Sequence, residues 1–150
     1  MPTPLTPLIG RADELATVKA FLTDPSHRLI TLTGAGGSGK TRLAIEAAGQ
    51  VNQHFAHGVA FASLASVTES DAMAPALAQA LGLSLSGHES ADTQLIDYLR
   101  HRQRLIVLDN FEHLIDGLPL VHDILTSASK VEILVTSRVR LNIPGEQVIL

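Results

Sequence analysis

The chain has 150 residues, of which 45% are hydrophobic and 3% aromatic, and it contains no cysteine. Its 15 acidic residues outnumber its 11 basic residues and give a formal net charge of −4. This composition excludes a disordered tail and excludes disulfides and thiolate metal sites. It also lacks the basic excess and the aromatic residues that nucleic-acid surfaces use, so we expect no direct nucleic-acid binding.

Residues 1–7 contain three prolines and are predicted to form an extended lead-in or the end of a linker. We expect residues 8–150 to form one domain. The opening MPTPLTPLIG lacks the basic start and apolar run of a signal peptide. No apolar run approaches the ~18 residues that a membrane-spanning helix needs. We therefore expect a cytoplasmic protein without a membrane partner.

Apolar residues recur at helical spacing or run together in short β-prone stretches, and these two patterns alternate along the chain. The helical stripes lie at residues 11–22, 43–51, 73–81, 92–99 and 119–125, and the β-prone runs lie at residues 29–33, 59–62, 104–110, 131–136 and 148–150. Parallel strands need crossover connections, which helices supply. The alternation therefore predicts an α/β fold with three layers, in which helices flank a mostly parallel sheet of roughly five strands.

The strongest motif follows the first predicted strand and opens the second predicted helix. It reads Gly34-Ala35-Gly36-Gly37-Ser38-Gly39-Lys40-Thr41 and matches the Walker A pattern G-x-x-x-x-G-K-[ST] at every fixed position. Glycines let backbone N–H groups approach phosphate oxygens, and the start of a helix favours negative charge. Lys40 is expected to contact the β- and γ-phosphates, and Thr41 is expected to offer its hydroxyl to Mg²⁺. We therefore predict a P-loop NTPase fold that binds nucleotide through residues 34–41.

Two features that dinucleotide-binding and GTP-binding proteins use are absent from the sequence, and their absence bears on which nucleotide binds. The dinucleotide pattern G-x-G-x-x-G also occurs, at residues 34–39, but residues 61–67 contain no acid to bind a ribose. The chain contains no N-K-x-D string, which GTP-specific proteins use to read guanine. These observations favour ATP or ADP, or a pocket without base specificity.

Asp109 ends the apolar run Leu105-Ile106-Val107-Leu108, which is typical of a strand buried on both faces. This is the Walker B position, where an acid holds Mg²⁺ directly or through water. The next residue is Asn110, whereas many fast ATPases have a glutamate there to orient the attacking water. Glu112 is a candidate substitute, and the alternative is a solvated loop residue. We therefore expect slow hydrolysis, or hydrolysis that needs a partner.

Arg138 belongs to the string Thr136-Ser137-Arg138, which follows the predicted strand Val131 to Val135. An arginine at the end of a strand beside the phosphates could reach the γ-phosphate and report its presence. The alternative is a solvent-facing loop arginine. Arg140 is a weaker candidate for the same role.

The series of motifs resembles the NB-ARC group of the signal-transduction ATPases with numerous domains (STAND). The resemblance rests on LIGRADEL, TLTGAGGSGKTRLA, LIVLDNFEHL and ILVTSR, which occur in this order between residues 8 and 138. It covers nearly the whole chain, and it is nearest to the bacterial branch of large transcriptional regulators and signalling proteins. Asn110 agrees with that branch.

The resemblance implies a set of roles: Ile9, Gly10 and Arg11 beside the adenine and ribose, Gly36 to Arg42 around the phosphates, Asp109 at Mg²⁺, and Arg138 as the sensor. Members of the group act as switches, closed with ADP and open with ATP. They carry a helical subdomain and a winged-helix domain after the last strand. We expect these domains of a longer parent protein to be absent from this sequence, and we expect self-association on activation.

Three functions remain open from the sequence. The leading one is an ATP/ADP-binding switch. The second is a turnover enzyme, either an AAA-type motor, which would usually show a second Walker B acid, or a small-molecule kinase, which would need an acceptor site. The third is an interaction scaffold that has lost nucleotide binding, and the intact Lys40, Thr41 and Asp109 argue against it.

Overall fold

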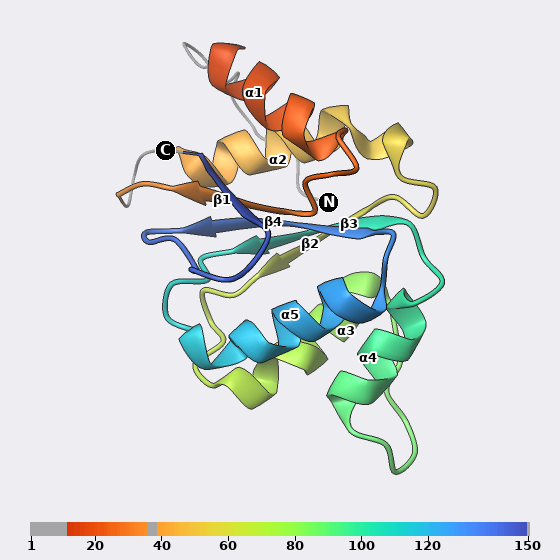
Figure 1. The fold of residues 1–150 in the computed structure, drawn as a ribbon. Helices are drawn as coiled ribbons and strands as arrows, with labels where there is room; N and C mark the ends of the chain where they lie inside the picture. Colours follow the sequence, from red (N-terminus) through yellow and green to blue (C-terminus); the bar gives the residue numbers. More distant parts are fainter. Residues whose placement is uncertain (1–11, 36–38, 150) are drawn as a thin grey trace.

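The computed structural model describes residues 12–35 and 39–149. Within these residues, five β-strands form one sheet, and α-helices cover both of its faces (Figure 1). The strands are β1 (Leu29–Thr33), β2 (Val59–Ser63), β3 (Arg104–Asp109), β4 (Val131–Ser137) and β5 (Glu146–Ile149). The α-helices are α1 (Ala12–Leu22), α2 (Lys40–Gln50), α3 (Met73–Leu81), α4 (Ala91–Leu99) and α5 (Leu118–Ser127), with short 3₁₀ helices at Asn52–His54, Ser70–Ala72 and Ile115–Gly117.

The strands lie in the order β2-β3-β4-β1-β5, and each neighbouring pair is parallel. This confirms the predicted three-layer α/β architecture with a parallel five-stranded sheet. Because all strands run in the same direction, their carboxyl ends meet at one edge of the sheet. Strand β4 separates β1 from β3, so the end of β4 lies between the segments that follow β1 and β3.

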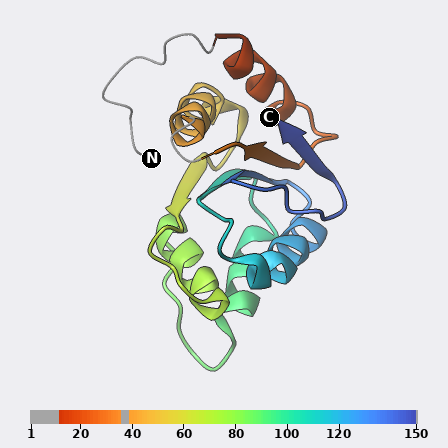
Figure 2. The same cartoon turned by 90° about the vertical axis from the view of Figure 1, so that its left-hand side faces the viewer.

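The two faces of the sheet carry separate hydrophobic clusters because successive side chains along a strand point to opposite faces. In β3, Leu105 and Val107 pack with residues of α1 and α2, whereas Ile106 and Leu108 pack with residues of α3, α4 and α5. Figure 2 shows the same division, with α1 and α2 on one side of the sheet and α3, α4 and α5 on the opposite side. The apolar run in β3 is thus explained by burial on both faces. None of the described helices is long and apolar enough to cross a membrane.

Arg28 joins the amino-terminal edge of the sheet to the end of α5. Its guanidinium donates hydrogen bonds to the backbone oxygens of Leu125 (2.8 Å), Ala128 (2.6 Å) and Val131 (3.0 Å). Carbonyls at the end of a helix have no further helical N–H partners, so Arg28 supplies a donor to Leu125 in the last turn of α5. The Ala128 carbonyl also accepts from the backbone N–H of Val131 at 3.1 Å. The contact places the starts of β1 and β4 side by side.

Glu132, the second residue of β4, is buried at the same edge. Its side chain is 6% exposed, and its Oε2 atom has no hydrogen-bond partner among the described residues. Burial raises the pKa of Glu132 to about 8, although the nearby Arg28 cation acts in the opposite direction. A carboxyl with this pKa carries a proton at neutral pH, which lowers the cost of burying it.

The raised pKa of Glu132 predicts a pH-dependent stability. Between about pH 4.5 and pH 8 the unfolded chain releases this proton while the folded chain keeps it, so the free energy of unfolding falls as pH rises. Glu132→Gln should remove this contribution, which amounts to a few kcal/mol at roughly 1.4 kcal/mol per pKa unit. Urea unfolding at about pH 5 and about pH 8.5 measures the difference. Glu69→Gln, at an exposed residue, is the control. If the free energy of unfolding changes equally with pH in Glu132→Gln and in the wild type, the prediction is contradicted.

Candidate functional site

The segment that joins β1 to α2 presents the start of a helix at the carboxyl edge of the sheet. Gly39 has a left-handed backbone conformation (φ 84°), which favours glycine, and α2 begins at Lys40. The first N–H groups of α2 have no acceptor within the helix, so they can serve an anion. Several predicted site residues lie outside the described residues: Ile9, Gly10, Arg11, Gly36, Gly37 and Ser38.

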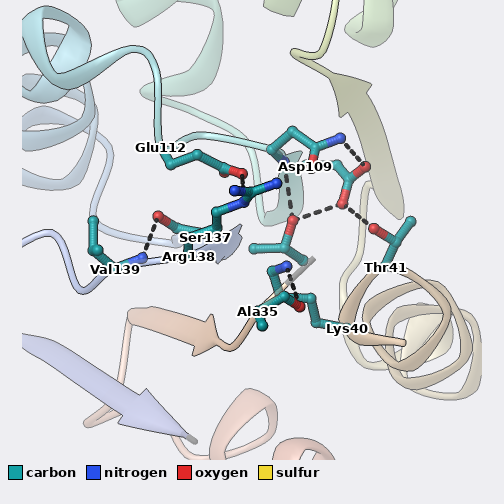
Figure 3. Close-up of polar contacts among 10 residues, drawn as sticks. Ala35, Lys40, Thr41, Asp109, Glu112, Ser137, Arg138 and Val139 are labelled. Atoms are coloured by element: carbon teal, nitrogen blue, oxygen red, sulfur yellow. Dashed lines mark hydrogen bonds and ion pairs between the residues drawn. The ribbon is translucent and has the colours of Figure 1, made fainter. Parts of the chain in front are cut away.

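Lys40 and Thr41 belong to the first turn of α2 (Figure 3). Lys40 is buried, and its Nζ donates a hydrogen bond to the backbone oxygen of Ala35, two residues after β1, at 3.4 Å. Thr41 Oγ1 donates a 2.7 Å hydrogen bond to Asp109 Oδ1. The two motifs that the sequence predicted at separate strand ends are therefore in direct contact.

Asp109 is the last residue of β3 and is 4% exposed. Its Oδ1 accepts hydrogen bonds from the hydroxyls of Thr41 (2.7 Å) and Thr136 (2.6 Å), and its Oδ2 accepts one from Asn110 Nδ2 at 3.2 Å. All three donors are neutral, so they orient the carboxylate without cancelling its charge. A buried carboxylate held in this way is suited to attract a cation.

Asn110 adopts a left-handed backbone conformation (φ 64°), which asparagine tolerates better than most residues with a side chain. Its backbone N–H donates to Thr136 Oγ1 at 2.9 Å, while its side-chain amide donates to Asp109. The residue after the Walker B acid therefore acts as a hydrogen-bond donor in this structure. The backbone conformation itself disfavours a glutamate at this position.

Thr136 belongs to the site, although no sequence motif indicated a role for it. Its fully buried hydroxyl donates to Asp109 and accepts from the backbone of Asn110, so it links β4 to the end of β3. A threonine near the end of a predicted strand is a weak signal. It becomes informative only once β4 is known to lie beside β3.

Arg138 and Glu112 face each other beside the start of α2 (Figure 3). Arg138 Nε lies 3.7 Å from Glu112 Oε1. Both side chains border a pocket of about 310 Å³, whose lining residues are Gly39, Lys40, Thr41, Arg42, Asn110, Glu112 and Arg138. The structure thus brings the last three residues of the Walker A motif, Gly39 to Thr41, together with Glu112 and Arg138. Arg140 does not line this pocket, and its Nε atom lies 3.9 Å from Glu146 Oε1.

Comparison with known proteins places this geometry in a family. Residues 24–143 match the AAA domain family. An uncharacterized protein of Mycobacterium tuberculosis (strain H37Rv) is 37% identical over 143 residues, or 95% of this chain. A second protein of that strain, named as an HTH-type transcriptional regulator, is 40% identical over 121 residues, or 80% of this chain. The chain spans only 36% and 14% of the lengths of these two relatives.

Solved structures share the fold at low sequence identity. Cdc6p from Pyrobaculum aerophilum superposes with a TM-score of 0.72 at 15% identity, covering 93% of this chain and 42% of that chain. A STAND protein with a tetratricopeptide repeat sensor from Pyrococcus horikoshii superposes with a TM-score of 0.60 at 17% identity. The match covers 99% of this chain and 23% of that chain. The ORC2 protein of Aeropyrum pernix, solved in ADPNP-ADP complexes, superposes with a TM-score of 0.62 at 15% identity. The match covers 87% of this chain and 41% of that chain. The chain is therefore a P-loop nucleotide-binding domain and belongs to the AAA domain family.

Proposed function

We propose that this chain is the ATP/ADP-binding switch module of a larger regulator of the STAND, NB-ARC-like type. The observation that carries the proposal is the 2.7 Å contact between the Thr41 hydroxyl and the Asp109 carboxylate at the carboxyl edge of the sheet. The relative named as an HTH-type regulator and the fold likeness to a STAND protein support the regulatory setting. The ADPNP-ADP complexes of the ORC2 protein support adenine nucleotides as ligands.

The donor set at this contact fits Mg²⁺. Thr41 and Asp109 offer a hydroxyl and a carboxylate oxygen, which are the hard ligands that Mg²⁺ prefers beside phosphate oxygens. We assign metal binding to these two residues, with Thr136 and Asn110 holding the Asp109 carboxylate in position. When bound, Mg²⁺ would neutralise part of the phosphate charge.

The phosphates would be held by the backbone of residues 34–41 together with the side chains of Lys40 and Arg42. The position of Lys40 in the first turn of α2 and on the wall of the pocket supports this role. Arg138 borders the same pocket and would contact the γ-phosphate. We keep Ile9, Gly10 and Arg11 as the proposed adenine and ribose contacts. Further domains of a parent protein, and self-association on activation, belong to the same proposal, as does a cytoplasmic setting.

Lys40→Ala should weaken the binding of both ATP and ADP by about 10- to 150-fold while the fold is retained. The loss follows because a charge-assisted contact to phosphate contributes roughly 1.5–3 kcal/mol, and Lys40 also lines the cavity wall. Calorimetric titration measures the affinities, and circular dichroism checks the fold. Lys130→Ala, an exposed lysine at the opposite edge of the sheet, is the matched control. Equal affinities in Lys40→Ala and the wild type would exclude the assigned phosphate site.

Asp109→Asn should remove most of the magnesium dependence of ATP binding. The amide keeps an oxygen that can accept from Thr41 and Thr136 and keeps the size of the side chain. It loses the negative charge and the hydrogen bond that Oδ2 accepts from Asn110. The measurement is the ratio of ATP affinities with Mg²⁺ and with EDTA, for wild type and variant. A ratio that survives the substitution would exclude Asp109 as the metal residue.

Hydrolysis by the wild-type chain should be slow. Asn110 follows Asp109, donates to its carboxylate and cannot act as a base, so the position that often orients the attacking water carries no acid. We expect phosphate release well below about 1 s⁻¹, the lower end for ordinary enzymes. Turnover at or above that rate would favour a motor or an enzyme over a switch. Glu112→Gln would then test whether Glu112 orients the attacking water.

A further inference from the structure

The ion pair between Glu112 and Arg138 lies at the edge of the proposed phosphate pocket (Figure 3). Glu112 follows β3 by three residues, and Arg138 is the first residue after β4. Arg138 is 66% exposed, whereas Glu112 is 22% exposed. A mobile cation therefore meets a largely buried acid within reach of any ligand bound beside Lys40 and Thr41.

The pair is weakly held. The distance of 3.7 Å between Arg138 Nε and Glu112 Oε1 is too long for a hydrogen bond. The other carboxylate oxygen of Glu112, Oε2, is buried and has no hydrogen-bond partner among the described residues. An exposed arginine in such a pair gains little, because solvent screens the attraction and the side chain loses freedom. A better anion could therefore take Arg138 away from Glu112.

The backbones that carry the two side chains are anchored on both sides. Phe111 N–H, next to Glu112, donates to the backbone oxygen of Thr136 at 3.0 Å. Beyond Arg138, the backbone N–H groups of Leu141 and Asn142 donate to the carboxylate of Glu146 at 2.7 and 2.9 Å. We therefore expect a change of partner at Arg138 to proceed by rotation of its exposed side chain, with the neighbouring backbone held in place.

We propose that Glu112 competes with the γ-phosphate for Arg138 and so sets the preference of the site between ATP and ADP; this inference rests on the proposed function. Phosphate oxygens form stronger, bidentate contacts with a guanidinium than a carboxylate 3.7 Å away does. ATP supplies a γ-phosphate that draws Arg138 from Glu112. ADP lacks this group, so Arg138 stays with Glu112. Separating Arg138 from Glu112 offsets part of the binding free energy of ATP. The affinities of the site for ATP and ADP therefore differ less than they would without Glu112.

The test is a double-mutant cycle on affinities for Mg·ATP and Mg·ADP, measured by calorimetry for wild type, Glu112→Gln, Arg138→Gln and the double variant. Glu112→Gln should raise the ratio of ATP to ADP affinity by about two- to fivefold, the fold-change that a partly exposed ion pair corresponds to. The same substitution in the Arg138→Gln background should leave the ratio unchanged. The second comparison is needed because removing any acid near phosphates strengthens their binding in general.

Matched controls are available on the same edge of the sheet. Arg140→Gln removes an arginine of the same loop with similar exposure, 61%, and Glu69→Gln removes an exposed acid. Neither should change the ATP to ADP ratio. An unchanged ratio in Glu112→Gln, or an equal rise with and without Arg138, would overturn the competition while leaving the proposed function standing.

A measurement on the ligand-free protein distinguishes a failure of the proposed competition from a failure of the proposed function. The Arg138 Nε–Hε signal in NMR should shift in Glu112→Gln, because its nearest anion is removed. An unshifted signal overturns the ion pair, and with it the competition, whatever the nucleotides do. A wild-type chain that binds neither nucleotide, with the Arg138 signal shifted by the substitution, overturns the proposed function and the competition built on it.

Discussion

The rest of the site depends on the hydrogen bonds that the buried carboxylate of Asp109 accepts. It accepts hydrogen bonds from Thr41 at the start of α2 and from Thr136 in β4, as well as from its own neighbour Asn110. These contacts join the segments after β1, β3 and β4 into one unit. They are possible only because β4 lies between β1 and β3, so that all three strand ends open onto the same edge. The charge of the carboxylate is oriented by neutral groups and remains available to a cation.

Much of the fold could be predicted from the sequence because the signals are local. Apolar periodicity located the helices and strands, and the two-sided burial of β3 follows from its uninterrupted apolar run. Strand order carries no such local signal, so the role of Thr136 emerged only when β4 was found beside β3. The left-handed conformation of Asn110 was likewise hidden, since asparagine is common in many loop conformations. For Ile9, Gly10 and Arg11, which lie outside the described residues, the assigned contacts stay predictions.

The charges around the pocket favour a switch over rapid turnover. Cationic side chains suited to phosphate line the pocket, but the residue that follows Asp109 is an asparagine that donates a hydrogen bond and cannot act as a base. These features support the proposed switch, in which a triphosphate is bound and is cleaved slowly. The anchored backbones around Arg138 confine the response to side chains within this domain. Any larger movement would then require other domains that contact this edge.

The most direct test of the account is a calorimetric titration of the chain with ATP, ADP and GTP, each with and without Mg²⁺. The account predicts that both adenine nucleotides bind, that GTP binds more weakly, and that Mg²⁺ strengthens the binding of ATP through Thr41 and Asp109. Absence of binding by either adenine nucleotide, or ATP binding that is indifferent to Mg²⁺, would contradict it.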